Sequence, residues 1–201
     1  MTMWAGYISQ PSWKRLQNNP MGLPAMSARH LLFAVVLLVG ACSEASRFPP
    51  LKIRVGQVLP VLTLKDLQGQ PVTLATNNGK LLIINLWATW CAPCRHELPS
   101  LDRLAKMLDP RQARVIGVSV DMDDHVLREY LIERGLAFAN YRDAERRVAD
   151  GIIGIHVYPT TLFVGPDGTL LKVVQGWREW DTPEMAAEVR ALLRESAAKG
   201  Q

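Results

Sequence analysis

Cysteine is scarce in this chain: 201 residues contain three thiols, Cys42, Cys91 and Cys94, and a single CxxC spacing. A structural zinc site needs about four nitrogen or sulfur ligands. The sequence has no second CxxC, and its four histidines are scattered rather than grouped, so we assign no metal. The odd number of cysteines leaves one thiol outside the CxxC pair that needs its own explanation.

Acidic residues are missing from positions 1–41, which carry Lys14, Arg15 and Arg29. This segment therefore supplies most of the formal charge of +4, and the rest of the chain has 20 basic and 19 acidic residues. Nucleic-acid binding requires a dense basic face, which a nearly neutral domain does not provide. We expect no nucleic-acid partner.

Long hydrophobic runs are missing as well. The apolar run over 31–39 is far shorter than the roughly 18 residues of a membrane-spanning helix. It follows a basic residue and precedes two small ones, which is the layout of a secretory signal peptide that begins at Met26. Residues 1–25 show no readable pattern, so we expect translation to start at Met26 or Met21. A buried helix of the domain is the alternative, but the run has no polar face.

The sequence Val39-Gly40-Ala41-Cys42 resembles the lipobox of bacterial lipoproteins, in which the cysteine is lipid-modified and becomes the first mature residue. The resemblance accounts for the odd cysteine. It implies a signal peptide over 1–41, lipid attachment at Cys42, and an anchor and tether over 42–50, in a periplasmic protein held at a membrane. A secretory peptide without lipid is the alternative, and the choice between inner and outer membrane stays open.

The remaining sequence alternates strand and helix patterns. Continuous apolar segments predict strands buried on both faces at 81–87 and 115–120. Turn and capping residues predict hairpins over 58–75 and 160–176, and helices over 91–108, 123–134 and 181–198. The early alternation implies parallel strands and the late hairpin adds antiparallel ones. We therefore predict one α/β domain over 51–198, with a mixed sheet and helices on both of its faces.

The CxxC pair lies where an apolar strand gives way to a helix. A helix that opens at Cys91 places this thiol beside unpaired backbone N–H groups and the positive end of the helix dipole. Such surroundings lower a thiol pKa from about 8.5 to roughly 3.5–7.5, which makes Cys91 a nucleophile near neutral pH. Cys94 lies one turn later and deeper, where it can attack a mixed disulfide. The spacing favours a reversible redox couple.

Two other uses of the pair compete with redox exchange. A structural disulfide that closes so short a loop removes little chain entropy, so it stabilises a fold weakly. A Cu(I)-binding carrier is harder to dismiss because soft thiolates favour Cu(I). We keep the copper carrier as the alternative function.

Three segments together resemble the thioredoxin superfamily, and specifically the exported TlpA and ResA-like thiol-disulfide oxidoreductases. They are NLWATWCAPC at 85–94, Pro99, and YPTTLFVGPDGTL at 158–170. The resemblance covers about residues 51–198. It implies a thioredoxin-like fold in which helices flank a mixed central sheet, with an N-terminal β-hairpin extension.

The resemblance also implies roles for individual residues. Cys91 becomes the attacking thiol and Cys94 the resolving one, and Pro159 takes the place of the family's cis-proline. A trans turn proline is the alternative at Pro159. Trp90 and Tyr158 join Pro159 as the residues expected to bind substrate.

Glu97 matches a carboxylate that manages protons for the buried thiol in ResA-like proteins. An ordinary exposed helix glutamate is the alternative. Asn85 stands where cytoplasmic thioredoxins carry a buried aspartate, and an amide cannot exchange a proton during turnover. Glu97 is therefore the candidate acid–base group.

The implied function is reduction of disulfides in exported proteins, of the cytochrome c maturation or copper-site assembly type. The implied partners are those proteins and a membrane electron donor of the DsbD or CcdA type. No cofactor is expected beyond the redox-active Cys91–Cys94 disulfide. The direction of electron flow does not follow from the spacing, because it depends on the reduction potential of the pair.

Overall fold

The structure is a computed structural model that describes residues 51–76 and 78–199. The predicted signal peptide and the lipid-attachment residue Cys42 lie outside these residues. Among the residues described, no helix combines the length and the apolar character needed to cross a membrane.

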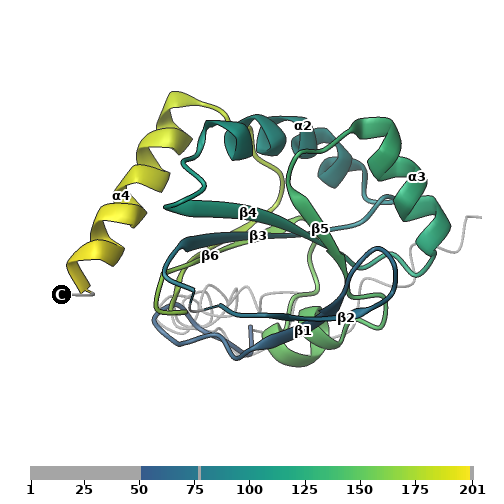
Figure 1. Ribbon diagram of the computed structural model, residues 1–201, viewed down its shortest axis with the longest axis horizontal. Coiled ribbons are helices and arrows are strands. Elements are labelled where there is room, and N and C mark those ends of the chain that lie inside the picture. The colour runs from purple at the N-terminus through teal and green to yellow at the C-terminus, as the bar shows by residue number, and fades with distance from the viewer. Residues whose placement is uncertain (1–50, 77, 200–201) are drawn as a thin grey trace, which may run out of the picture. The chain divides into compact units, whose positions relative to one another are not determined.

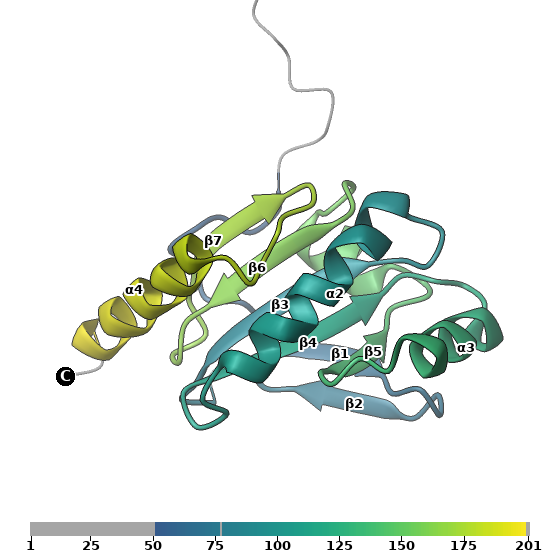
Figure 2. The same cartoon turned by 90° about the horizontal axis from the view of Figure 1, so that it is seen from above.

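Seven strands form one mixed sheet, which confirms the predicted thioredoxin-like α/β class (Figures 1 and 2). Their spatial order is β2-β1-β5-β4-β3-β6-β7. β3 pairs in parallel with β4 and antiparallel with β6, while β4 pairs in parallel with β5. The strands are β1 (Leu62–Lys65), β2 (Pro71–Leu74), β3 (Leu81–Trp87), β4 (Ala113–Ser119), β5 (Ala139–Arg142), β6 (Thr160–Val164) and β7 (Leu170–Gln175).

Helices lie on both faces of the sheet, as predicted. Three of them cover one face, and the π-helical segment lies on the other (Figure 1). The three are α2 (Ala92–Met107), α3 (Asp124–Arg134) and α4 (Pro183–Lys199), and the π-helical segment is η2 (Arg147–Ile153).

The position of β3 at the centre of the sheet follows from its composition. All seven of its residues are buried, because β4 and β6 flank it and helices cover its face. Six of its seven residues are apolar, as suits a strand buried on both faces, and the polar one, Asn85, donates hydrogen bonds to Glu97 and Thr161. β3 ends at Trp87, four residues before the helix cap at Cys91. The CxxC pair therefore lies just beyond the C-terminal end of a central strand.

Helix α3 begins and ends where the sequence predicts. The Asp123 side chain accepts hydrogen bonds from the backbone N–H groups of His125 (2.8 Å) and Val126 (3.3 Å), which caps the first turn. Gly135 ends the helix in the left-handed conformation (φ 59°), which glycine adopts at little cost.

Two elements are missing from the sequence-based prediction, and one is shorter than predicted. β5 and η2 were not expected, and the first hairpin strand begins at Leu62 rather than at Val58. Val58 and Val61 are exposed, so their apolar side chains are not part of a buried strand face. The segment η2 follows Arg146, which has a left-handed backbone (φ 52°), and its first N–H groups bond to the buried carboxylate of Asp143.

Candidate active site

Cys91 and Cys94 form a disulfide at the start of α2. Cys91 is the N-cap residue, and its Sγ accepts a hydrogen bond from the backbone N–H of Cys94 (3.3 Å). Cys91 keeps 6% of its surface exposed whereas Cys94 is fully buried. Cys91 is therefore the less buried member of the pair.

Pro159 lies beside the end of β3 that leads to the disulfide. The Tyr158–Pro159 peptide bond is cis, as the resemblance implies. Thr160, the next residue, pairs with Leu86 in the antiparallel register of β3 and β6, so Pro159 borders the last residues of β3. The structure thus brings the proline and the CxxC segment together from positions far apart in the sequence.

Trp90 and Tyr158 meet at the same end of the sheet. Their rings pack edge to face with centroids 6.1 Å apart, and Trp90 remains 58% exposed. The Arg146 guanidinium lies over the Tyr158 ring, 5.8 Å from its centroid. Burial raises the pKa of the Tyr158 hydroxyl to about 12, with the negative charge of Asp150 acting in the same direction, so the hydroxyl is neutral at physiological pH.

Glu97 is fully buried, three residues after Cys94 on the same helix. Three N–H donors surround its carboxylate. Asn85 Nδ2 donates to Oε1 (2.7 Å), while the Arg178 backbone N–H and Trp180 Nε1 each donate to Oε2 (3.0 Å). The expectation of an interior carboxylate is therefore correct, and the alternative of an exposed helix glutamate is wrong.

Burial raises the pKa of the Glu97 carboxyl above its ordinary value of 4.5. The hydrogen bonds from Trp180 and Asn85 oppose this shift, as do the backbone N–H and the positive charge of Arg178. The shift makes Glu97 easier to protonate than an exposed glutamate. A carboxyl with such a pKa, one helical turn from the buried thiol, is suited to proton exchange.

Comparison with known proteins assigns this arrangement to a family. The sequence profile of the AhpC/TSA family matches residues 55–173. The chain belongs to the AhpC/TSA family. Within the thioredoxin superfamily it is a TlpA/ResA-like protein, and its activity is that of a thiol-disulfide oxidoreductase.

Two relatives and one solved structure illustrate the similarity. The thiol-disulfide oxidoreductase ResA of Bacillus thuringiensis is 27% identical over 158 residues, which are 75% of this chain and 91% of the relative. ResA of Oceanobacillus iheyensis is 32% identical over 127 residues, covering 61% of this chain and 66% of the relative. A thioredoxin-family thiol:disulfide interchange protein from Chlorobium tepidum superposes with a TM-score of 0.58 at 26% identity, covering 71% of this chain and 99% of the other.

Sequence reasoning missed the contribution of the C-terminal half to the site of this AhpC/TSA-family chain. Trp180 and Arg178 reach Glu97 across 83 and 81 positions of sequence. Trp177, from the same segment, packs against His96 with ring centroids 4.9 Å apart. Tryptophans in a short segment between a strand and a helix carry no local pattern that assigns them to a redox site, so the fold was needed to find them.

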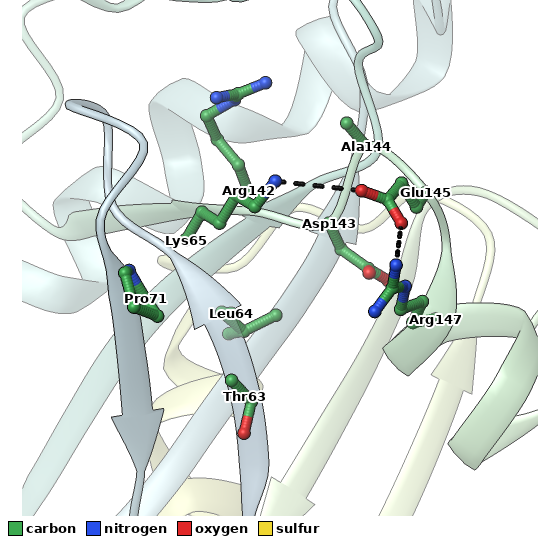
Figure 3. A pocket seen from close by; sticks show the side chains of 9 residues that line it. All are labelled: Thr63, Leu64, Lys65, Pro71, Arg142, Asp143, Ala144, Glu145 and Arg147. Atoms are coloured by element: carbon green, nitrogen blue, oxygen red, sulfur yellow. Dashed lines mark ion pairs between the residues drawn. The ribbon is translucent and has the colours of Figure 1, made fainter.

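A hollow of about 170 Å³ lies beside β1 and the segment that follows β5 (Figure 3). Its charges are paired with one another, because Glu145 forms ion pairs with both Lys65 and Arg147. The Arg142 guanidinium turns away from the hollow and pairs with Asp124 of α3. None of the nine residues that line this hollow is a cysteine or a histidine, so it offers no second redox centre.

Proposed function

We propose that the protein is an exported reductase of protein disulfides that works through Cys91 attack and Cys94 resolution. The observation that carries this proposal is the asymmetry of the pair. Cys91 lies at a helix N-terminus, where a thiolate is stabilised, and keeps 6% of its surface exposed, whereas Cys94 is fully buried. An intermolecular disulfide can therefore form at Cys91 and not at Cys94.

Reduction of the substrate takes two thiol–disulfide exchange steps. The Cys91 thiolate attacks one sulfur of a substrate disulfide, and the other substrate sulfur leaves as a thiolate that takes up a proton. The Cys94 thiolate then attacks Cys91 Sγ, which re-forms the Cys91–Cys94 disulfide and releases the second substrate sulfur. Two electrons pass from the pair to the substrate. Glu97 accepts the proton that Cys94 loses in the second step.

The partners we propose are disulfide-containing exported proteins of the cytochrome c maturation or copper-site assembly type. The oxidised pair then needs a reductant, and we propose a membrane electron donor of the DsbD or CcdA type. The relatives named ResA support this assignment, because they are thiol-disulfide oxidoreductases that match most of the described domain.

Trp90, Tyr158 and Pro159 form the proposed substrate face. Replacing Trp90 with alanine removes an exposed ring beside the reactive sulfur. Since an aromatic contact contributes roughly 1 kcal/mol, the second-order rate constant for reduction of a peptide disulfide should fall about fivefold. Quenched-flow measurement of thiol release checks this result. Trp90→Phe keeps a ring and should retain most of the rate, whereas an unchanged rate in Trp90→Ala would remove Trp90 from the substrate face.

The proposed location is the periplasm, with a lipid anchor at Cys42. A Cys42→Ser change removes the thiol that lipid attachment requires and leaves the CxxC pair intact. We expect the wild type to sediment with membranes and the variant to appear in the soluble fraction, with equal disulfide-exchange activity in the two. A wild-type protein that is soluble, or that retains residues 1–25 in its mature form, would contradict the anchor.

A further inference from the structure

The segment that joins β7 to α4 takes part in the redox site. This strap, residues 176–182, begins at Gly176, which has a left-handed backbone (φ 83°), and passes between α2 and α4 (Figure 2). Trp180 anchors it: the side chain is fully buried and packs against Phe163 of β6, with ring centroids 6.2 Å apart. Its backbone N–H donates to Ser100 Oγ of α2 (3.1 Å).

The strap supplies two of the three hydrogen bonds to Glu97. The Trp180 indole N–H and the Arg178 backbone N–H both donate to Oε2, and Asn85 of β3 donates to Oε1. A carboxylate accepts hydrogen bonds only, whereas a protonated carboxyl must also donate one. Three donors around one carboxyl therefore match its ionised form.

Burial works against these donors. It raises the pKa of Glu97, and the hydrogen bond from Trp180 is the largest influence that lowers it again. On the strap, Arg178 adds a positive charge that also favours the anion. The neighbours from the strands, Asn85 and Thr161, are neutral, and α2 contributes Cys94, which titrates only when the disulfide is reduced. The indole N–H is therefore one of the contacts that oppose protonation of Glu97, and it is the side-chain donor that the strap contributes.

We propose that Trp180 is a positioning residue for disulfide exchange, because its indole N–H holds the carboxylate of Glu97, three residues after Cys94 on α2, and so influences how readily that carboxyl takes up a proton. The inference rests on the proposed role of Glu97 as the proton acceptor for Cys94. It adds a residue from the C-terminal strap that acts through Glu97 and does not touch the reacting sulfurs.

The direct test is the titration of Glu97 in the oxidised full-length protein, followed by NMR of its side-chain carboxyl carbon. Trp180→Phe keeps a large ring and removes the N–H, so the Glu97 midpoint should rise by about one pH unit, a tenfold change in proton affinity. Ser100→Ala is the matched control, because it removes the other Trp180 contact to α2 without touching the carboxylate. Its midpoint should stay near that of the wild type. Equal shifts in both variants, or no shift in Trp180→Phe, would overturn the inference.

A second measurement needs no substitution. In the wild type, the Trp180 indole N–H resonance should titrate with the same midpoint as the Glu97 carboxyl, because the two groups share a hydrogen bond. An indole resonance that stays constant while Glu97 titrates would contradict the coupling, even if Trp180→Phe does not fold.

The pH profile of exchange then separates this inference from the proposed function. Trp180→Phe should shift the profile of the wild type and should not shift that of Glu97→Gln, since the effect passes through the carboxyl. A shifted Glu97 titration with an unchanged pH profile would support the positioning of Glu97 by Trp180 and overturn the proton role of Glu97. A shifted profile in the Glu97→Gln background would overturn the inference itself.

Discussion

Replacing Cys94 with alanine is expected to arrest the reaction at the mixed disulfide, with Cys91 bonded covalently to the substrate. Cys91 keeps its place at the N-terminus of α2, so the first exchange step proceeds. The second step has no nucleophile, because Cys94 is the thiol that attacks Cys91 Sγ in the proposed mechanism. Turnover should fall by at least about a thousandfold, while the covalent complex accumulates to near one equivalent.

Non-reducing electrophoresis and peptide mapping measure the trapped complex and place its bond. A Cys91→Ala variant is the matched control, and it should trap nothing because Cys94 is fully buried. A complex formed through Cys94 would contradict the assigned roles. If neither variant traps a partner and the reduced wild type binds one equivalent of Cu(I) through both thiolates, the copper carrier becomes the better account.

Replacing Glu97 with alanine is expected to lower the free energy of unfolding by about 3 kcal/mol. The change leaves the buried N–H groups of Asn85 and Trp180 without their acceptor, and with them the part-buried backbone N–H of Arg178. Each buried donor left unpaired costs about 1–3 kcal/mol, and relief of the buried negative charge offsets part of the sum. Denaturant unfolding of the oxidised protein measures the difference.

The size of this loss should depend on pH, and its sign follows from the raised pKa of Glu97. The folded protein binds the proton more tightly than the unfolded chain does, so the contribution of Glu97 to stability is fully present below its ordinary pKa of 4.5. It declines as pH rises through the folded pKa. The gap between wild type and Glu97→Ala should therefore narrow toward neutral pH. Glu133→Ala, at an exposed position of α3, is the control and should change stability by under about 0.5 kcal/mol. A constant gap would show that Glu97 does not titrate differently in the folded protein.

The sequence was most informative where local pattern and tertiary role agree. The apolar run at 81–87 is fully buried, and Asp123 and Gly135 bound α3 as their residue types predict. The redox pair could also be predicted, because the spacing of a CxxC motif and its position at the start of a helix both follow from adjacent residues. These features depend on interactions within a few positions of the chain.

The features that escaped prediction depend on distant contacts. β5 is four residues long with a mixed burial pattern, and it forms a strand because β4 and β1 lie beside it. The start of η2 is held by the Asp143 carboxylate rather than by a local capping pattern. The donors around Glu97 come from β3 and from the strap, so the burial of this glutamate could be proposed from the family resemblance alone.

The reduction potential of the Cys91–Cys94 pair decides whether the protein reduces or oxidises its partners. Stabilising a thiolate favours the reduced pair and raises the potential, as the helix N-terminus does at Cys91. At Cys94 the effect is the opposite, because burial disfavours a thiolate, as does the buried carboxylate of Glu97 one helical turn later on α2. We expect the destabilised thiolate of Cys94 to outweigh the stabilised thiolate of Cys91, which lowers the reduction potential of the pair.

Equilibration of the pair with a dithiol redox buffer at pH 7 tests the central claim most directly. Our account predicts a reducing couple, close to the value of about −270 mV that is typical of thioredoxin. A potential near the value of about −120 mV that is typical of the oxidant DsbA would contradict it, and would reverse the direction of electron flow through Cys91.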